Sequence, residues 1–208
     1  LESLDTDCYK TGADEITNIP LLKYIARKGK PILMSTGIST MTEISMAIEA
    51  IKEEGNENIL LFQTTSIYPN DPKDANLRVM ETFRLAFNAP VGFSDHTADI
   101  FTPVAAAALG ACMIEKHFCL SRQDPGTDTF FALEPTEFKE MCKGIRIAQA
   151  ALGTSQKYIL EGEKKTAKGF RKSFIAWRDI KKGEILTEEN TIVKRPGDGI
   201  WPIHYQAV

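Results

Sequence analysis

Two of the three histidines in this 208-residue chain end short apolar segments, VGFSDH and MIEKHF. His96 and His117 lie about one βα repeat apart, and in a parallel sheet that repeat returns the chain to the same edge. We therefore expect both imidazoles at the carboxyl ends of neighbouring strands, where α/β folds bind ligands. Two neutral imidazoles, with the carboxylates of Asp95 and Glu115 close by, suit a catalytic divalent metal. The alternative is two unrelated core or surface histidines, but their matching positions favour the metal site.

The elements that would position these histidines alternate between apolar strands and amphipathic helices. Strands are predicted at CYKTG, KPILMSTG, NILLFQTTSIYP, PVGFSDH and MIEKHF. Helices are predicted at about 18–28, 40–54 and 76–87, in the alanine-rich segment after His96, and at 135–152. Asn18 is a suitable N-cap for the first helix, and Thr40 with Glu43 forms a capping box for the second.

This alternation predicts a parallel sheet covered by helices. A Rossmann sheet is the rival fold, but no GxGxxG sequence follows any of the strands. Polar residues recur at all five strand ends: Lys10, Ser35, Thr65 with Ser66, Ser94 with His96, and Glu115 with His117. A barrel gathers its strand ends around one centre, whereas an open sheet does not. We therefore predict a TIM (β/α)8 barrel of which only the last five βα units are present.

The composition changes after Gly153, and this change predicts a second domain. Residues 1–152 are assigned to the C-terminal part of the barrel domain. Residues 153–172 are polar, rich in lysine and without periodicity, so they are interpreted as a linker. Residues 173–208 contain short strand and turn patterns, which predict a small β-rich domain that is cut short.

The overall composition is that of an ordinary globular protein, with 43% apolar and 25% charged residues. The net charge of -3 gives no electrostatic reason to expect nucleic acid or an anionic membrane as a partner. No apolar segment has membrane-spanning length, and no signal peptide opens the chain. The four scattered cysteines are interpreted as free thiols, with Cys112 and Cys119 in the core, which indicates a reducing, cytoplasmic location.

Several motifs, in this order, resemble the sialic acid synthase family: KPILMSTGIST, TTSIYP, GFSDHT, ALGACMIEKHF, the DPGTD loop with ALEP, and IKKGE with VKRPGDG. The resemblance covers essentially the whole chain. It implies a TIM barrel followed by an antifreeze-like (SAF) domain, in a domain-swapped homodimer. It also implies a transferase that condenses phosphoenolpyruvate with an N-acetylated hexose and water, giving a nonulosonic acid and phosphate. N-acetylmannosamine or a diacetamido-hexose would be the sugar, and Mn²⁺, with Mg²⁺ as the alternative, would be the metal.

The resemblance also assigns roles to single residues. The metal ligands of the family fall on His96 and His117. The positions that bind the phosphate and carboxylate of phosphoenolpyruvate fall on Lys10, Ser35, Ser66 and Ser94. A lysine at a strand end needs an anionic partner, whereas each serine, taken alone, could simply satisfy local backbone groups.

Tyr68 and Asp128 resemble positions that contact the sugar; the alternatives are a tyrosine packed on Pro69 and a solvated turn aspartate. Arg195 matches an arginine that reaches the partner subunit's active site and contacts the N-acetyl group. We expect Asp95 and Glu115 to orient the metal-binding histidines.

Two residues are predicted to stay outside the chemistry. Strand alternation directs Lys116 to the opposite face, so it is interpreted as structural, and His204 is assigned no role.

Two positions depart from the family pattern. Ala13 stands where many relatives carry a phosphate-contacting serine, and Ser66 stands where some carry asparagine. The family's catalytic carboxylate and a second phosphate-binding lysine lie on earlier barrel strands. We therefore expect these residues to be part of a longer protein and to be inactive alone.

Two alternative functions remain open. One is another phosphoenolpyruvate-condensing barrel, such as a deoxy-octulosonate phosphate synthase, although the SAF-like tail argues against it. The other is a binding or scaffold protein with a decayed synthase fold. The presence of His96, His117, Asp128 and Arg195 argues against decay.

Overall fold

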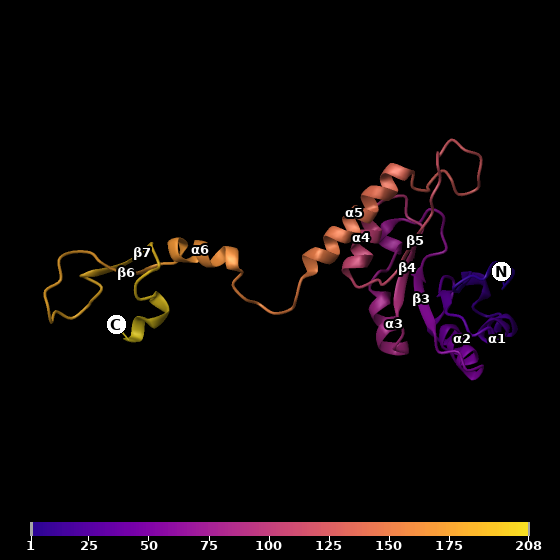
Figure 1. Ribbon diagram of the computed structural model, residues 1–208, viewed down its shortest axis with the longest axis horizontal. Coiled ribbons are helices and arrows are strands. Elements are labelled where there is room, and N and C mark those ends of the chain that lie inside the picture. Colours follow the sequence, from indigo (N-terminus) through magenta and orange to yellow (C-terminus); the bar gives the residue numbers. More distant parts are fainter. Residues whose placement is uncertain (1, 208) are drawn as a thin grey trace. The chain divides into compact units, whose positions relative to one another are not determined.

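The computed structural model describes residues 2–207. It divides into two compact units between Gly153 and Thr154, and each unit is described by itself (Figure 1). No helix in the described part of the chain is long and apolar enough to cross a membrane.

The first unit is a five-stranded parallel sheet with connecting helices. Its strands pair in sequence order and are β1 (Tyr9–Thr11), β2 (Ile32–Ser35), β3 (Ile59–Thr64), β4 (Val91–Asp95) and β5 (Ile114–Lys116). Its α-helices are α1 (Ile19–Ala26), α2 (Met41–Glu53), α3 (Val79–Phe87), α4 (Phe101–Ala108) and α5 (Pro135–Leu152). The five predicted strands and their parallel pairing are confirmed. A strand order that never reverses is typical of (β/α) barrels rather than of doubly wound sheets.

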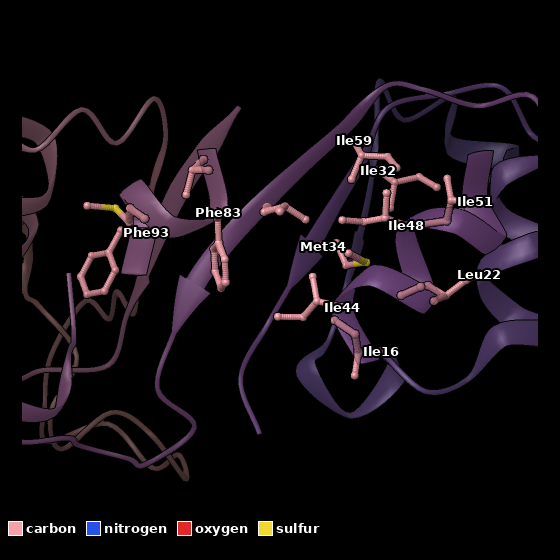
Figure 2. Packing of buried hydrophobic residues seen from close by; sticks show 14 of the residues in the cluster. Ile16, Leu22, Ile32, Met34, Ile44, Ile48, Ile51, Ile59, Phe83 and Phe93 are labelled. Carbon is pink, nitrogen blue, oxygen red and sulfur yellow. The ribbon is translucent and has the colours of Figure 1, made fainter. Parts of the chain in front are cut away.

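One face of this sheet packs against the helices and forms the core. Registered residues of neighbouring parallel strands share a face, so Ile32 with Ile59, and Phe93 with Ile114, face the helix side. Figure 2 shows Ile32 and Ile59 near Leu22 from α1 and Ile48 and Ile51 from α2, whereas Phe93 lies toward Phe83 from α3. The alternate residues occupy the opposite face, which carries polar groups: Lys10, Ser35, Thr64, Ser94 and Glu115. Successive residues of a strand therefore point alternately toward the helix-covered core and toward the face that carries the polar groups.

Local signals in the sequence set most helix ends. The Asn18 side chain accepts a hydrogen bond from the Leu21 amide, and Thr40 and Glu43 form the predicted reciprocal capping box. The predicted bounds of α5 are confirmed. Helix α3 begins three residues later than predicted, because Asn76 has a left-handed φ of 46°, which a right-handed helix cannot include.

Gly92, in the middle of β4, lies where the sheet leaves no room for a side chain. A Cβ at this position would lie 2.8 Å from the Met113 carbonyl oxygen and 2.7 Å from the Phe62 ring. The carbonyl belongs to the backbone and cannot turn aside. We therefore expect Gly92→Ala to push β4 away from β5 and to destabilise the first unit by about 1–3 kcal/mol. Urea unfolding measures this effect. Gly162→Ala would separate it from a general effect of replacing glycine, since Gly162 has no left-handed φ and a Cβ there meets no atom within 4 Å.

The second unit contains helix α6 (Glu161–Phe170) and a two-stranded antiparallel sheet of β6 (Ser173–Ala176) and β7 (Thr191–Lys194). Helix α6 lies inside the stretch interpreted as an aperiodic linker, so that interpretation missed an element. The helix contains good helix formers and its first turn is held by the bond from the Leu160 amide to Glu163. None of its residues is buried, so a search for the buried face of a helix does not find it.

The cysteines of the described chain are all free. Cys119 is buried, as expected, but Cys112 is exposed, so its prediction as a core thiol is wrong. It lies two residues before the short outer strand β5 and two residues after the turn at Gly110, outside the strand itself.

Candidate active site

A pocket of about 330 Å³ lies at the carboxyl ends of the strands of the first unit. It is lined by Lys10, Gly12, Ala13, Ser35, Tyr68, Ser94, His96, Glu115, His117 and Asp128. Apart from Gly12 and Ala13, every lining residue was predicted from the sequence. A larger groove of about 640 Å³ lies between α2 and α3, but no ionisable side chain lines it. The smaller pocket is therefore the candidate site.

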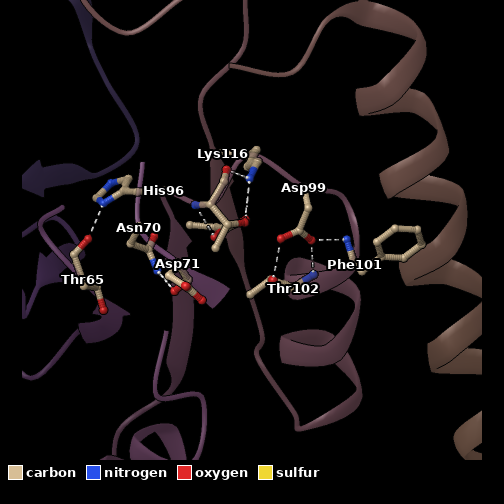
Figure 3. Close-up of polar contacts among 10 residues, drawn as sticks. Thr65, Asn70, Asp71, His96, Asp99, Phe101, Thr102 and Lys116 are labelled. Atoms are coloured by element: carbon tan, nitrogen blue, oxygen red, sulfur yellow. Dashed lines mark hydrogen bonds and ion pairs between the residues drawn. The ribbon is translucent and has the colours of Figure 1, made fainter. Parts of the chain in front are cut away.

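His96 follows β4 directly and is held in one orientation. Its Nδ1 lies 2.7 Å from the Thr65 carbonyl oxygen, and because a carbonyl only accepts, Nδ1 carries the proton (Figure 3). Burial lowers the pKa of His96, although the bond to Thr65 acts in the opposite direction. The ring is thus neutral near pH 7, with a lone pair on Nε2. Tyr68 packs on this ring with centroids 4.1 Å apart.

His117 follows β5 and completes the pair. Its ring centroid lies 5.3 Å from that of His96, with the planes nearly perpendicular. The ring packs on Phe131 at 4.8 Å, and its Nδ1 lies 3.9 Å from Oδ2 of Asp128. The loop that leads to α5 therefore supports the second histidine, and Thr65 supports the first.

The donor set fits a divalent metal that keeps open positions. Within residues 2–207, no group of three or more His, Cys, Asp or Glu side chains has the arrangement of a metal site. Two imidazoles in a polar pocket would leave most coordination positions to substrate or water, unlike a closed structural zinc site. The lone pair of His96 Nε2 and the short distance between the rings are consistent with one shared ion.

Glu115 joins the cationic part of the pocket instead of orienting a histidine. Its Oε1 accepts a hydrogen bond from Ser94 Oγ at 2.8 Å and lies 3.3 Å from Lys10 Nζ. The prediction that Glu115 orients a metal-binding histidine is therefore wrong. Strand alternation puts Glu115 on the same face as Ser94, and the ladder pairs the two residues. Lys10 has the anionic partner that its position required.

Asp95 does not reach the histidines either. Its carboxylate accepts hydrogen bonds from the Thr97 amide and hydroxyl and pairs with Lys116 Nζ at 2.6 Å. A direct contact between Asp95 and a metal-binding histidine is therefore ruled out, because alternation along β4 directs Asp95 away from the pocket, and Asp95 can act on the rings only through the strand ends that carry them. Lys116, drawn in Figure 3 with its contacts, faces away from the pocket as predicted.

Besides Asp95, two more predicted residues lie outside this pocket's lining. Ser66 lines the larger groove, and its buried Oγ forms no hydrogen bond within the described chain. Arg195 belongs to the second unit, where its guanidinium lies 4.6 Å from the centre of the Phe170 ring. Their roles stay predictions.

Sequence reasoning missed two supports of the histidines. The Thr65 carbonyl is a backbone group, so nothing in the residue type indicates its role. Phe131 lies in a loop without periodicity, and its side chain is buried against His117. Ala13 was noted only as a departure from the family pattern, yet it lines the pocket.

The lowered pKa of His96 predicts a pH dependence of stability. An unfolded histidine titrates near pH 6.5, and folded His96 titrates lower, so below about pH 6.5 the unfolded state binds a proton that the folded state lacks. The free energy of unfolding should therefore fall as the pH drops from about 6.5. Urea unfolding across this range measures the effect. His96→Gln should remove it, while replacing the exposed His204 by glutamine should leave it; an unchanged slope in His96→Gln would contradict the assignment.

The sheet and pocket define an α/β protein with paired imidazoles and a lysine at its strand ends, and comparison with known proteins gives the same class. The chain belongs to the NeuB family: the family model matches residues 1–157, and the SAF domain model matches residues 171–208.

Individual relatives carry the names of several different synthases. The chain is 42% identical to the N,N'-diacetyllegionaminic acid synthase of Campylobacter jejuni, over 99% of this chain and 62% of that protein. It is 39% identical to a pseudaminic acid synthase of the same species, over 99% of this chain and 60% of that protein. A solved N-acetylneuraminic acid synthetase from Leptospira borgpetersenii has a TM-score of 0.74 at 29% identity, over 80% of this chain and 58% of that one. The chain spans about 60% of the length of the curated relatives it matches.

Proposed function

We propose that the protein is a nonulosonic acid synthase, which condenses phosphoenolpyruvate with an N-acetylated hexose and water and releases phosphate. The observation that carries this proposal is a single pocket that joins two imidazoles to a lysine and hydroxyl donors at the strand ends. The synthase names of its relatives support the same reaction class. In the reaction, the methylene carbon of phosphoenolpyruvate bonds to the sugar aldehyde carbon, whose oxygen takes up a proton. Water adds to the carbon that carries the phosphate, and the bond between that carbon and the phosphate oxygen breaks to release phosphate.

Lys10, Ser35 and Ser94 would bind the anionic groups of phosphoenolpyruvate. Lys10 supplies the positive charge, and its ammonium lies 5.3 Å from the centre of the Phe62 ring, so an apolar surface supports it from below. Glu115 holds Lys10 and Ser94 in place before substrate arrives. Pre-ordered donors bind an anion without first losing side-chain freedom. Ser66 stays a candidate contact from the family pattern.

His96 and His117 would hold the divalent metal, with Mn²⁺ proposed and Mg²⁺ as the alternative. The metal would supply Lewis-acid polarisation of the sugar aldehyde oxygen. Asp128, beside His117, would accept hydrogen bonds from sugar hydroxyls. Tyr68 would donate to the sugar, since partial burial raises the pKa of its hydroxyl and keeps it protonated.

The remaining assignments concern the whole protein. We propose that the sheet of the first unit is part of a closed TIM barrel, that residues 153–172 connect it to the SAF domain, and that two copies form a domain-swapped homodimer. Arg195 of one copy would then contact the N-acetyl group in the other. The order of the strands supports the barrel, and the match of the SAF domain supports the second domain; the homodimer and the role of Arg195 follow from the family resemblance.

The test is phosphate release by the full-length protein from phosphoenolpyruvate with Mn²⁺ and a panel of sugars. The panel holds N-acetylmannosamine, its 6-phosphate and diacetamido-hexoses, with an arabinose 5-phosphate arm for the octulosonate alternative. Release that requires one N-acetylated sugar supports the proposal and identifies the substrate. Release only with arabinose 5-phosphate would favour the alternative synthase. No release with any sugar, from folded protein that binds Mn²⁺, would favour a scaffold.

A further inference from the structure

A buried ion pair lies directly behind the two candidate metal-binding histidines. Lys116 Nζ lies 2.6 Å from Asp95 Oδ2, and the two side chains are 1% and 0% exposed. Lys116 also donates to the carbonyl and hydroxyl oxygens of Thr97, a fully buried residue, and Thr97 donates from its amide and hydroxyl to Asp95. The three residues therefore form a closed set of hydrogen bonds on the helix side of the sheet.

This set occupies the last position at which β4 and β5 are held together. Asp95 and Lys116 form the final registered pair of the ladder, and each is followed directly by one of the histidines. Beyond that pair, the two chains separate. Thr97 lies one residue after His96, so the set fixes the chain on both sides of His96.

The other hydrogen bonds of the two residues hold each histidine to a different part of the fold. The His96 ring is bound by Thr65, and its carbonyl accepts from the Asn70 amide. His117 accepts a bond from the Leu133 amide through its own carbonyl. None of these hydrogen bonds joins one histidine-bearing strand end to the other. Tyr68 packs on both rings, with centroids 4.1 Å and 5.9 Å away, but it does not connect the backbones of the two strands. The Ser94–Glu115 bond does join them, but it lies on the pocket face, where substrate also binds.

The free-energy balance of a buried ion pair suggests a role other than adding stability. Removing two charges from water is costly, and buried pairs are often no more stabilising than apolar residues of similar volume. What a buried pair does supply is one defined geometry, because any other arrangement leaves a charge unpaired. We propose that Asp95, Lys116 and Thr97 are positioning residues that set the spacing of the His96 and His117 rings for a shared divalent ion. The inference rests on the proposed function for the identity of that ion.

The experiment compares full-length wild type with the double variant Asp95→Asn, Lys116→Met, which removes both charges together. Mn²⁺ affinity is measured by electron paramagnetic resonance. The rings are followed in metal-free protein by NMR of histidine labelled at Cε1, with His96 and His117 signals assigned from single glutamine variants. Ile51→Ala is the control for stability, since this fully buried residue of α2 lies in the core and outside the pocket.

We expect the double variant to bind Mn²⁺ roughly tenfold to 100-fold more weakly, as is typical when groups that orient metal ligands are removed. The His96 and His117 signals should shift or split, and the His204 signal should not. Ile51→Ala should unfold more easily yet keep the affinity and the ring signals. Thr97→Val should weaken Mn²⁺ binding, and Thr97→Ser, which keeps the hydroxyl, should preserve it.

Unchanged ring signals and unchanged affinity in the double variant would overturn the positioning role and leave the proposed function standing. An equal loss of affinity in Ile51→Ala would also overturn it, because the effect would then follow stability. Wild type that fails to bind Mn²⁺ would instead contradict the metal assignment of the proposed function. The ring signals of the metal-free protein would still decide whether the ion pair places the histidines.

Discussion

Replacing both His96 and His117 by alanine is expected to abolish Mn²⁺-dependent phosphate release while the protein stays folded. A bound metal contributes several kcal/mol of charge stabilisation in such reactions, which corresponds to a loss of about 10²–10³-fold in rate or more. Both side chains line the pocket, so alanine removes ligands without opening the hydrophobic core on the helix side. Single-turnover phosphate release and circular dichroism, measured together on the full-length protein, check the two parts of this expectation.

His204→Ala is the matched control, since His204 is exposed and lies in the second unit. It should keep wild-type rate and Mn²⁺ affinity. If the double variant retained more than about a tenth of the wild-type rate, the histidines would not hold an essential metal. Loss of both activity and secondary structure would point to a structural role instead.

The candidate site was largely predictable because strand periodicity determines direction as well as position. Once VGFSDH and MIEKHF are taken as neighbouring parallel strands, alternation puts Ser94, His96, Glu115 and His117 on one face. The same alternation puts Lys116 on the other, as the structure has it. The five strands were predictable for a related reason: before the strand ends, most of their helix-facing residues are apolar and belong to the core.

The contacts of the carboxylates were not predictable in the same way. Asp95 and Glu115 each adjoin a histidine-bearing strand end, and nearness in sequence suggested that they orient the rings. In the structure, Asp95 faces its registered partner Lys116, and Glu115 faces Ser94 and Lys10. Register across the sheet decided the partners, and register is not contained in the sequence of a single strand. Support of His96 by a backbone carbonyl and the exposed helix α6 left no pattern of residue types at all.

Breaking the buried ion pair between Asp95 and Lys116 should lower the free energy of unfolding strongly, whereas breaking a surface pair should hardly change it. Lys116→Met alone leaves the Asp95 carboxylate buried without its counter-charge. Asp95→Asn alone leaves the Lys116 ammonium buried without its counter-charge. Each single change should destabilise the first unit by about 3–5 kcal/mol. The double variant Asp95→Asn, Lys116→Met should lose much less stability, because no charge is left unpaired. Urea unfolding of the four proteins forms a double-mutant cycle that measures the coupling directly.

Lys143→Met provides the comparison, since Lys143 pairs with Glu140 on the surface of α5, where both side chains are more than half exposed. The same change of residue type there should have little measurable effect, because water solvates the remaining carboxylate. If Lys116→Met were equally mild, water would have to reach Asp95, and the pair would not restrain the strand ends. If the double variant were as unstable as either single one, packing rather than charge pairing would explain the loss. A pair that specifies geometry and adds little net stability should give a large coupling free energy between Asp95 and Lys116. The double variant should then be nearly as stable as the wild type.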